Sequence, residues 1–469
     1  MVFSSMVFLW IFFPAVFILS LVIRKTQYQN LLLLVTSLLF YAWGEPGNIL
    51  LLLVSILLNW AFGLLIDRFR GRGKVFLALD VVVNLALLGY FKYTDFFINT
   101  VNHVIPGGNL PLTNIALPIG ISFFTFQAMS YVIDLYRGQI KVQKNLLYLA
   151  LYVAFFPQLI AGPIVKYRDI ELQIDHRTVN PERVASGFRR FIYGLGKKVL
   201  ISNLVGQAAD SLYGLEVSSL TGGMAWLCAL TYTLQIYYDF SGYSDMAIGL
   251  GRMFGFDFLE NFRYPYLSSS IREFWRRWHI SLSTWFQEYL YIPLGGNRKG
   301  KGRTYLNLLI VFFATGMWHG ASWNFIAWGM YHGFFSIIER LGLGEILKRF
   351  RILPRIYTMV VVMIGWVFFR VEEFGQGFAI VARMLMPWRY TASDIILGTL
   401  VNSETILAIL CGILGCGVLQ AVFAGPKTAV LAEKWKGSLP EFVFCGLVLF
   451  ACILKLASNT YNPFIYFRF

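Results

Sequence analysis

Uncharged stretches long enough to cross a bilayer alternate with short charged loops along the chain. About 20 consecutive apolar residues span the hydrocarbon core as a helix. Stretches of that size cover residues 1–23, 26–44, 46–66, 146–165, 217–238 and 405–426. Weaker or interrupted stretches cover residues 75–91, 118–133, 184–205, 356–369 and 442–456. The pattern predicts an all-α polytopic membrane protein with about 11–13 transmembrane or re-entrant helices.

Residues 304–338 form the longest uncharged stretch. As one helix they would extend roughly 50 Å, which exceeds the thickness of the hydrocarbon core. We therefore predict two spans or a broken helix, with the break between Gly316 and Gly320. Because no internal repeat and no polar domain interrupts the chain, we treat residues 1–469 as one membrane-embedded domain. Its predicted parts are N-terminal helices in 1–145, a catalytic core in 146–338 and C-terminal helices in 339–469.

Residues 263–296 have a different pattern, because tryptophans and tyrosines alternate there with arginines between Pro265 and Pro293. Ser270 and Glu273 have the spacing of a capping box, and so do Thr284 and Gln287. The segment predicts short helices, either at the membrane interface or around a protein-lined cavity. Its pattern alone favours neither of these positions.

Composition excludes soluble and nucleic-acid-binding classes. Hydrophobic residues make up 57% of the chain and charged residues only 14%, too few to cover a soluble surface. The net charge of +15 is explained by basic loops. Cytoplasmic loops of membrane proteins are rich in Lys and Arg, so Arg24, Lys25 and the loops 68–74 and 297–303 are predicted to be cytoplasmic. This places the N-terminus outside.

The five cysteines have neither the spacing of a metal site nor that of a disulfide framework.

One histidine stands out as a candidate for chemistry. His319 lies inside the uncharged stretch 304–338, and an ionisable residue at membrane depth is by default a functional candidate. Ser322 is three residues further on and would share a helix face with it. His332 would face away on a continuous helix and is predicted to be structural. Because the sequence has no nucleophile elbow, we favour a histidine that acts as general base on a substrate hydroxyl.

A second polar group follows the apolar run that ends at residue 238. It contains Asp239, Ser241, Tyr243 and Asp245. Two carboxylates and two hydroxyls at the end of a span are expected to face a cavity or each other. A hydrogen-bonded turn without a catalytic role explains the group at least as well.

Several motifs together resemble the membrane-bound O-acyltransferase family. The similar segments are residues 157–164, 239–246, 274–285 and 291–297, the run Trp318-His319-Gly320-Ala321, and both ends of the chain, 1–5 and 466–469. The resemblance covers nearly the whole chain. The resemblance is strongest to the branch that O-acetylates bacterial alginate. It is second strongest to the branch that transfers D-alanine to teichoic acid.

The resemblance implies a ring of helices around a central funnel, with His319 as the family histidine at its floor. It places His279 where many eukaryotic relatives have asparagine, so chemistry and acyl positioning both remain open for His279. It further implies a bacterial cell membrane location, a cytoplasmic acyl thioester donor (acetyl-CoA or an acyl carrier), and no bound cofactor or metal. The acceptor would be a hydroxyl of an exported polysaccharide, with an extracytoplasmic acetylation protein as partner.

Other groups are candidates for binding the substrates. Arg272, Arg276, Arg277 and the loop 298–303 would attract donor phosphates, although membrane topology alone also explains that loop. Asn324, Trp318 or a backbone N–H near Gly320 would stabilise the oxyanion.

An alternative function is D-alanyl or other acyl transfer to a cell-wall polymer. A glycan or lipid transporter with His319 and the group 239–245 along its pathway is another.

Overall fold

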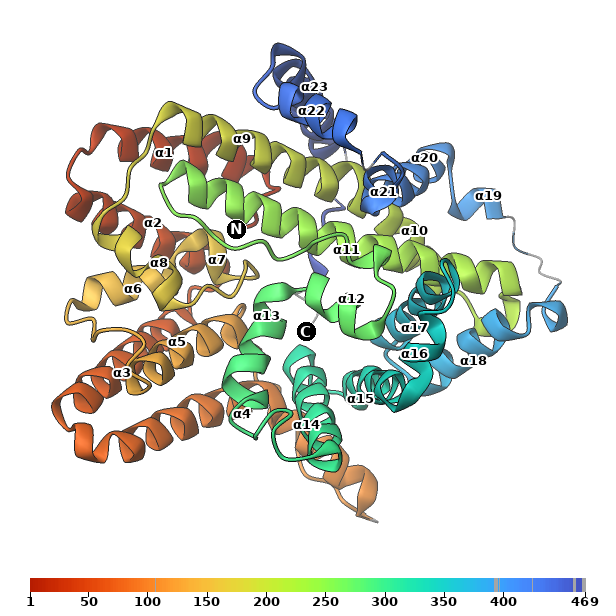
Figure 1. The fold of residues 1–469 in the computed structure, drawn as a ribbon, viewed down its shortest axis with the longest axis horizontal. Coiled ribbons are helices and arrows are strands. Elements are labelled where there is room, and N and C mark those ends of the chain that lie inside the picture. The colour runs from red at the N-terminus through yellow and green to blue at the C-terminus, as the bar shows by residue number, and fades with distance from the viewer. Residues whose placement is uncertain (106, 392–394, 396, 424, 459–460, 466–469) are drawn as a thin grey trace. The chain divides into compact units, whose positions relative to one another are not determined.

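The computed structural model is built from helices throughout the part of the chain that it describes, namely residues 1–105, 107–391, 395, 397–423, 425–458 and 461–465 (Figure 1). No strand occurs among these residues. Five described helical segments are long and apolar enough to cross a membrane: Ile49–Arg68, Arg70–Val104, Leu353–Arg370, Ser403–Val422 and Leu439–Ser458. The predicted all-α polytopic membrane fold is confirmed. The closing residues 466–469, which contribute to the family resemblance, lie outside the described residues.

The chain divides into two compact units. The first contains Met1–Phe191 and Ser244–Leu259, and the second contains Ile192–Tyr243 and Glu260–Phe469. Two helices, α9 (Pro181–Gly196) and α11 (Gly222–Met253), contribute residues to both units.

The first unit consists of the N-terminal helices. They are α1 (Phe13–Val22), α2 (Thr26–Gly44), α3 (Ile49–Arg68), α4 (Gly73–Val104), α5 (Ile121–Tyr136), α6 (Leu146–Ala154), α7 (Phe156–Leu159) and α8 (Tyr167–Asp175). Helix α2 has the predicted bounds, and α4 is longer than predicted. The stretch 146–165 is not one span, because α6 ends at Ala154 and Pro157 begins the short α7. Proline lacks the N–H that a continuing helix would need there.

The second unit contains the remaining helices. They are α10 (Asn203–Tyr213), α12 (Ile271–Arg277), α13 (Ile280–Phe286), α14 (Lys301–His319), α15 (Trp323–Ile338), α16 (Gly344–Leu347), α17 (Leu353–Arg370), α18 (Phe374–Leu385), α19 (Leu397–Leu400), α20 (Ser403–Ile413), α21 (Leu419–Val422), α22 (Pro426–Trp435) and α23 (Leu439–Ser458). Single π-helical turns continue some of them: η3 (Lys197–Ser202), η6 (Gln287–Tyr291), η7 (Glu339–Leu343) and η9 (Leu414–Val418).

The segment 263–296 folds into short helices, as predicted. The Ser270 hydroxyl caps α12 by accepting the Glu273 N–H at 3.0 Å. The Glu339 carboxylate of η7 also accepts the Ile271 N–H at 2.7 Å, which ties α12 to the end of α15. The predicted cap at Thr284 is wrong, because Thr284 lies inside α13 and the chain continues as helix into η6.

Candidate active site

The predicted break in the long uncharged stretch lies beside His319. Helix α14 ends at His319, Gly320 is extended (φ −170°, ψ 156°), and α15 starts after Ser322 (Figure 1). The predicted pairing of His319 with Ser322 on one helix face is therefore wrong, because no single helix carries both. The two helices form an antiparallel hairpin that places His319 at its turn.

Three aromatic rings surround the His319 imidazole, which is only 4% exposed. Ring centroids of Trp318, Trp328 and Phe369 lie 5.0, 5.1 and 5.2 Å from it. All three rings are nearly perpendicular to the imidazole, at 83°, 90° and 78°. The surroundings of His319 are therefore aromatic and exclude most water.

His279 joins α12 to α13 and is fully buried. Its backbone is left-handed (φ 43°, ψ 56°), which is uncommon for a residue with a side chain. The Asn261 Oδ1 accepts the Ser281 backbone N–H at 3.1 Å and the Ser281 hydroxyl at 3.0 Å. His279 Nδ1 lies 3.2 Å from the same oxygen and therefore donates to it. A neutral His279 then carries its lone pair on Nε2.

Trp318 brings the two histidines together. Its indole centroid lies 5.9 Å from the His279 ring and 5.0 Å from the His319 ring. On another side, Phe240 of α11 packs edge-on against His279 at 4.5 Å. Two imidazoles that are 40 positions apart in the chain thus share one aromatic neighbour. Asn261, which orients His279, was missed by the sequence reasoning, because a single asparagine in a polar loop gives no signal.

The group 239–245 is not the end of a span. Helix α11 continues through it to Met253, so these residues point in different directions around one helix. Asp239 is 1% exposed and forms an ion pair with Lys198 of η3 at 2.5 Å. Its other oxygen accepts the Ile465 N–H at 2.8 Å. One turn further, Tyr243 stacks on Phe464 at 4.7 Å. Both side chains contact the C-terminal segment 461–465.

Asp245 and Ser241 have other surroundings. Asp245 belongs to the first unit and accepts from Arg190, with Nε at 2.8 Å and a second guanidinium nitrogen at 2.5 Å. Asp239 and Asp245 therefore pair with different cations and do not face each other. Ser241 is 1% exposed, and its hydroxyl has no hydrogen-bond partner among the described residues.

The two candidate arginines of α12 differ. Arg277 forms an ion pair with Glu273 at 2.7 Å and donates to the Arg263 carbonyl at 3.4 Å. Arg276 is exposed and has no carboxylate within ion-pair distance among the described residues. It shares the outer face of α12 with Arg272, one turn away. Arg276 is therefore available to an external anion, whereas Arg277 stabilises α12.

Asn324 anchors the start of α15. Its side-chain amide donates to the carbonyls of Val371 and Glu372, each at 2.7 Å. Both N–H groups of the amide are thus used within the protein. This arrangement leaves no donor of Asn324 for an oxyanion.

Comparisons with known proteins agree on one family. The model of the membrane-bound O-acyltransferase family matches residues 139–369. A probable alginate O-acetylase of Azotobacter vinelandii is 42% identical over the whole of both chains. A peptidoglycan O-acetyltransferase of Helicobacter pylori is 36% identical over 82% of this chain and 80% of its own length. A teichoic acid D-alanyltransferase of Bacillus subtilis is 27% identical over 48% of this chain and 60% of its own length.

Proposed function

Because this chain belongs to the membrane-bound O-acyltransferase family, we propose that it moves an acetyl group from a cytoplasmic thioester to hydroxyls of an exported polysaccharide. The chain is a multi-pass membrane O-acyltransferase. The donor, acceptor and direction of transfer are the proposed part. Acetyl-CoA or an acyl carrier supplies the thioester. The acetyl group reaches the polymer directly or through an extracytoplasmic partner protein.

His319 is the proposed general base. Its imidazole takes the proton from the acceptor hydroxyl as the oxygen attacks the thioester carbonyl. The new C–O bond forms and the C–S bond breaks through a tetrahedral intermediate. The departing thiolate then recovers the proton from the imidazolium, which returns His319 to its neutral form. No covalent bond to the protein is required.

The surrounding rings have a role in this proposal. The three aromatic rings would hold the His319 imidazole in place and keep water away from it during the transfer. His279, whose Nδ1 is directed at Asn261, would position an acyl or hydroxyl group through a hydrogen bond at Nε2. Arg272 and Arg276 would attract the phosphates of the donor.

The proposal rests on one observation. Two buried imidazoles, those of His279 and His319, both pack against the Trp318 indole beside the break between α14 and α15. Imidazole is the side chain suited to proton transfer near neutral pH. Irregular backbone at membrane depth is tolerated only where it is buried in protein or lines a cavity. No observation gives comparable support to the transporter alternative.

D-alanyl transfer remains the second candidate function, because a teichoic acid D-alanyltransferase aligns with about half of this chain.

Alginate is the proposed acceptor class, since the similar full-length relatives include probable alginate O-acetylases. We place the protein in the bacterial inner membrane with its N-terminus outside, in accordance with the basic loops.

The decisive experiment compares His319→Ala with His332→Phe in membranes that contain the polysaccharide and its export partners. His332 is a matched control: it is fully buried in the same hairpin, both ring nitrogens lack a partner among the described residues, and Phe274 and Trp275 pack on its ring. We expect His319→Ala to reduce polymer acetylation at least about 100-fold, the lower range of general-base catalysis. His332→Phe should keep most activity and fold normally. Near-normal acetylation by a folded His319→Ala variant would refute the general-base role.

A further inference from the structure

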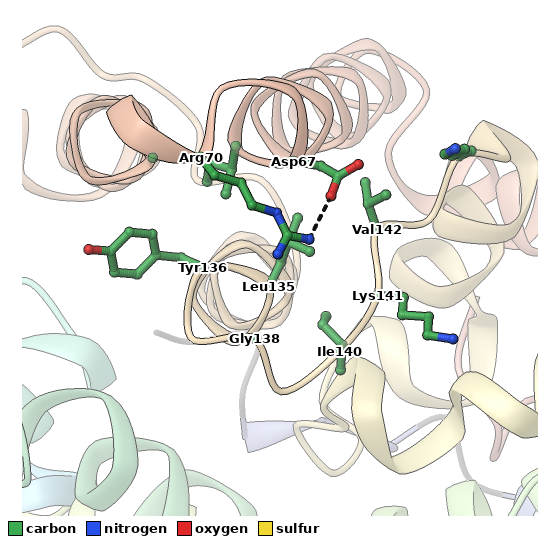
Figure 2. Close-up of a pocket in the computed structure, with 11 residues that line it drawn as sticks. Asp67, Arg70, Leu135, Tyr136, Gly138, Ile140, Lys141 and Val142 are labelled. Atoms are coloured by element: carbon green, nitrogen blue, oxygen red, sulfur yellow. Dashed lines mark hydrogen bonds and ion pairs between the residues drawn. The ribbon is translucent and has the colours of Figure 1, made fainter.

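A separate pocket of about 570 Å³ lies entirely within the first unit (Figure 2). It opens where α3 ends, α4 begins and the loop after α5 passes beside them. Its charged lining residues are Asp67, Arg70, Lys141 and Lys144, and its apolar lining includes Ile66, Leu135, Ile140 and Val142. Three cations against one carboxylate give the pocket a net positive charge.

The cations are available to a ligand. Arg70 forms an ion pair with Asp67 at 3.1 Å, but its side chain is 83% exposed, so solvent weakens that pair. Lys141 and Lys144 are exposed and form no ion pair within 4 Å among the described residues, although the Glu171 carboxylate accepts the Lys141 backbone N–H and partly offsets the charge of Lys141. Figure 2 shows Arg70 and Asp67 opposite the loop that carries Ile140, Lys141 and Val142.

The loop that supplies both lysines is held in place by Gln143. Its backbone N–H donates to the Tyr131 hydroxyl at 3.0 Å, and its carbonyl accepts the Trp60 indole N–H at 3.1 Å. Its side-chain amide donates to the Tyr167 hydroxyl at 2.7 Å. Gly138 makes the preceding turn with a left-handed backbone (φ +72°). The wall of the pocket is thus preformed, as binding sites for small ligands usually are.

The pocket lies at the ends of two candidate membrane spans. It adjoins the junction of two helices that can cross the membrane, Ile49–Arg68 and Arg70–Val104. Tyr136 lines it and is 42% exposed, and tyrosine is enriched at membrane–water interfaces. The neighbouring basic loop is predicted to be cytoplasmic. Topology alone explains the charges of that loop, but it requires neither a concave pocket nor a loop fixed through Gln143.

We propose that this pocket binds the headgroup of an anionic phospholipid from the cytoplasmic leaflet. The phosphate would lie against Arg70, Lys141 and Lys144, while the glycerol and the first carbons of the lipid chains contact Tyr136 and Val142. Basic pockets between transmembrane helices on this side recognise anionic headgroups by the same chemistry. The phosphate of a soluble acyl donor shares that chemistry, but the position of the pocket at the ends of two candidate membrane spans favours the lipid. The proposal is independent of the acyl-transfer mechanism.

The test uses the full-length protein in nanodiscs of phosphatidylcholine with a small fraction of phosphatidylglycerol, and counts bound phosphatidylglycerol by native mass spectrometry. Lys141→Met with Lys144→Met is the test variant, and Lys25→Met, which removes an exposed lysine outside the pocket, is the matched control. We expect roughly fivefold weaker binding for each pocket cation removed, with no change in the control. Lys141→Arg, which keeps the charge, should bind normally and shows that the loop is intact.

Four results would overturn the proposal. The first is phosphatidylglycerol binding that the pocket variant leaves unchanged. The second is an equal loss in Lys25→Met, which would reveal general charge attraction. The third is displacement of the lipid from wild-type protein by acetyl-CoA, or binding of acetyl-CoA alone, which would assign the pocket to the soluble donor. Phosphatidylethanolamine is included as a zwitterionic lipid, and equal retention of it would also contradict the anionic preference.

Discussion

The left-handed backbone of His279 changes how substitutions at this residue must be interpreted. Asparagine enters this region of φ and ψ several times more often than most residues with side chains, whereas alanine does not. Asparagine also keeps a donor and an acceptor, although it cannot act as a base. The backbone and the side chain therefore both favour asparagine over alanine at this position.

We expect His279→Asn to retain more acetylation than His279→Ala, and His279→Gly to separate the two causes. Glycine relieves the backbone but has no side chain to hydrogen-bond to Asn261 or the substrate. Acetylation and thermal unfolding are measured for all three variants. If His279 positions a substrate group, glycine is as inactive as alanine although it relieves the backbone strain that alanine carries there. Equal and complete loss in all three folded variants would instead point to proton transfer by His279.

At the scale of elements, the hairpin of α14 and α15 depends on glycines where the helices approach closely. A Cβ at Gly316 would lie 2.4 Å from the Phe325 carbonyl oxygen, and one at Gly329 would lie 2.3 Å from that of Phe312. Backbone at such short range cannot move aside without separating the helices. Small residues are the usual means of close helix packing in membranes. The position of His319 is set by this contact.

Gly316→Ala is therefore expected to lower the unfolding temperature and to reduce acetylation strongly by displacing the turn at His319. Gly302→Ala in the same helix is the matched control, since nothing lies within 4 Å of its Cβ position. Alanine exceeds glycine in helix propensity by about 1 kcal/mol, so the control should be neutral or slightly stabilising. Thermal unfolding in detergent and acetylation in membranes are compared. Wild-type behaviour of Gly316→Ala would show that the hairpin tolerates separation.

Helix α12 presents one face to the protein and the other to its surroundings. Substitutions of Arg276 and Arg277 test the two faces separately. We expect Arg276→Met to raise the KM for the thioester donor severalfold while the unfolding temperature stays unchanged. Arg277→Met should mainly lower stability, by up to about 1 kcal/mol, because its ion pair with Glu273 is partly exposed. Steady-state kinetics and thermal unfolding distinguish the two effects. The assignment of Arg276 to donor binding fails if both variants change KM equally.

At the scale of the whole molecule, distant segments of the second unit are joined by the C-terminal segment 461–465. Lys198 donates to the Pro463 carbonyl, and the Tyr461 hydroxyl donates to Asp210 at 2.6 Å. The buried pair of Asp239 and Lys198 holds the same segment. This geometry favours a structural role for Asp239 over substrate binding.

Replacing Asp239 by Leu leaves the Lys198 ammonium buried beside an uncharged side chain. Breaking a buried pair from one side typically costs about 3–5 kcal/mol, whereas removing both charges is far less harmful. We therefore expect Asp239→Leu to unfold at much lower temperature, and the double variant Asp239→Leu with Lys198→Met to recover most of that loss. Thermal unfolding of purified protein decides this. A stable but inactive Asp239→Leu variant would contradict the structural role and would support substrate binding by Asp239.

The sequence by itself determined that the chain is helical and crosses a membrane, where the long stretch 304–338 breaks, and how Ser270 caps α12. It also singled out His319 and predicted the family. These features depend on hydrophobic length, on the missing N–H or Cβ of proline and glycine, and on side chains a few positions apart. All of that information is local in the chain.

Tertiary structure alone decided which groups meet. Asp239 and Asp245 belong to one motif, yet they pair with Lys198 and Arg190, and the contact from Ile465 to Asp239 spans 226 positions. Asn324 uses its amide to anchor α15, and Asn261 orients His279. Polar groups buried away from water must find partners wherever the packed helices place them. Those partners are set by how helices distant in sequence pack together, and the hydrophobic pattern of a single segment contains no information about that packing.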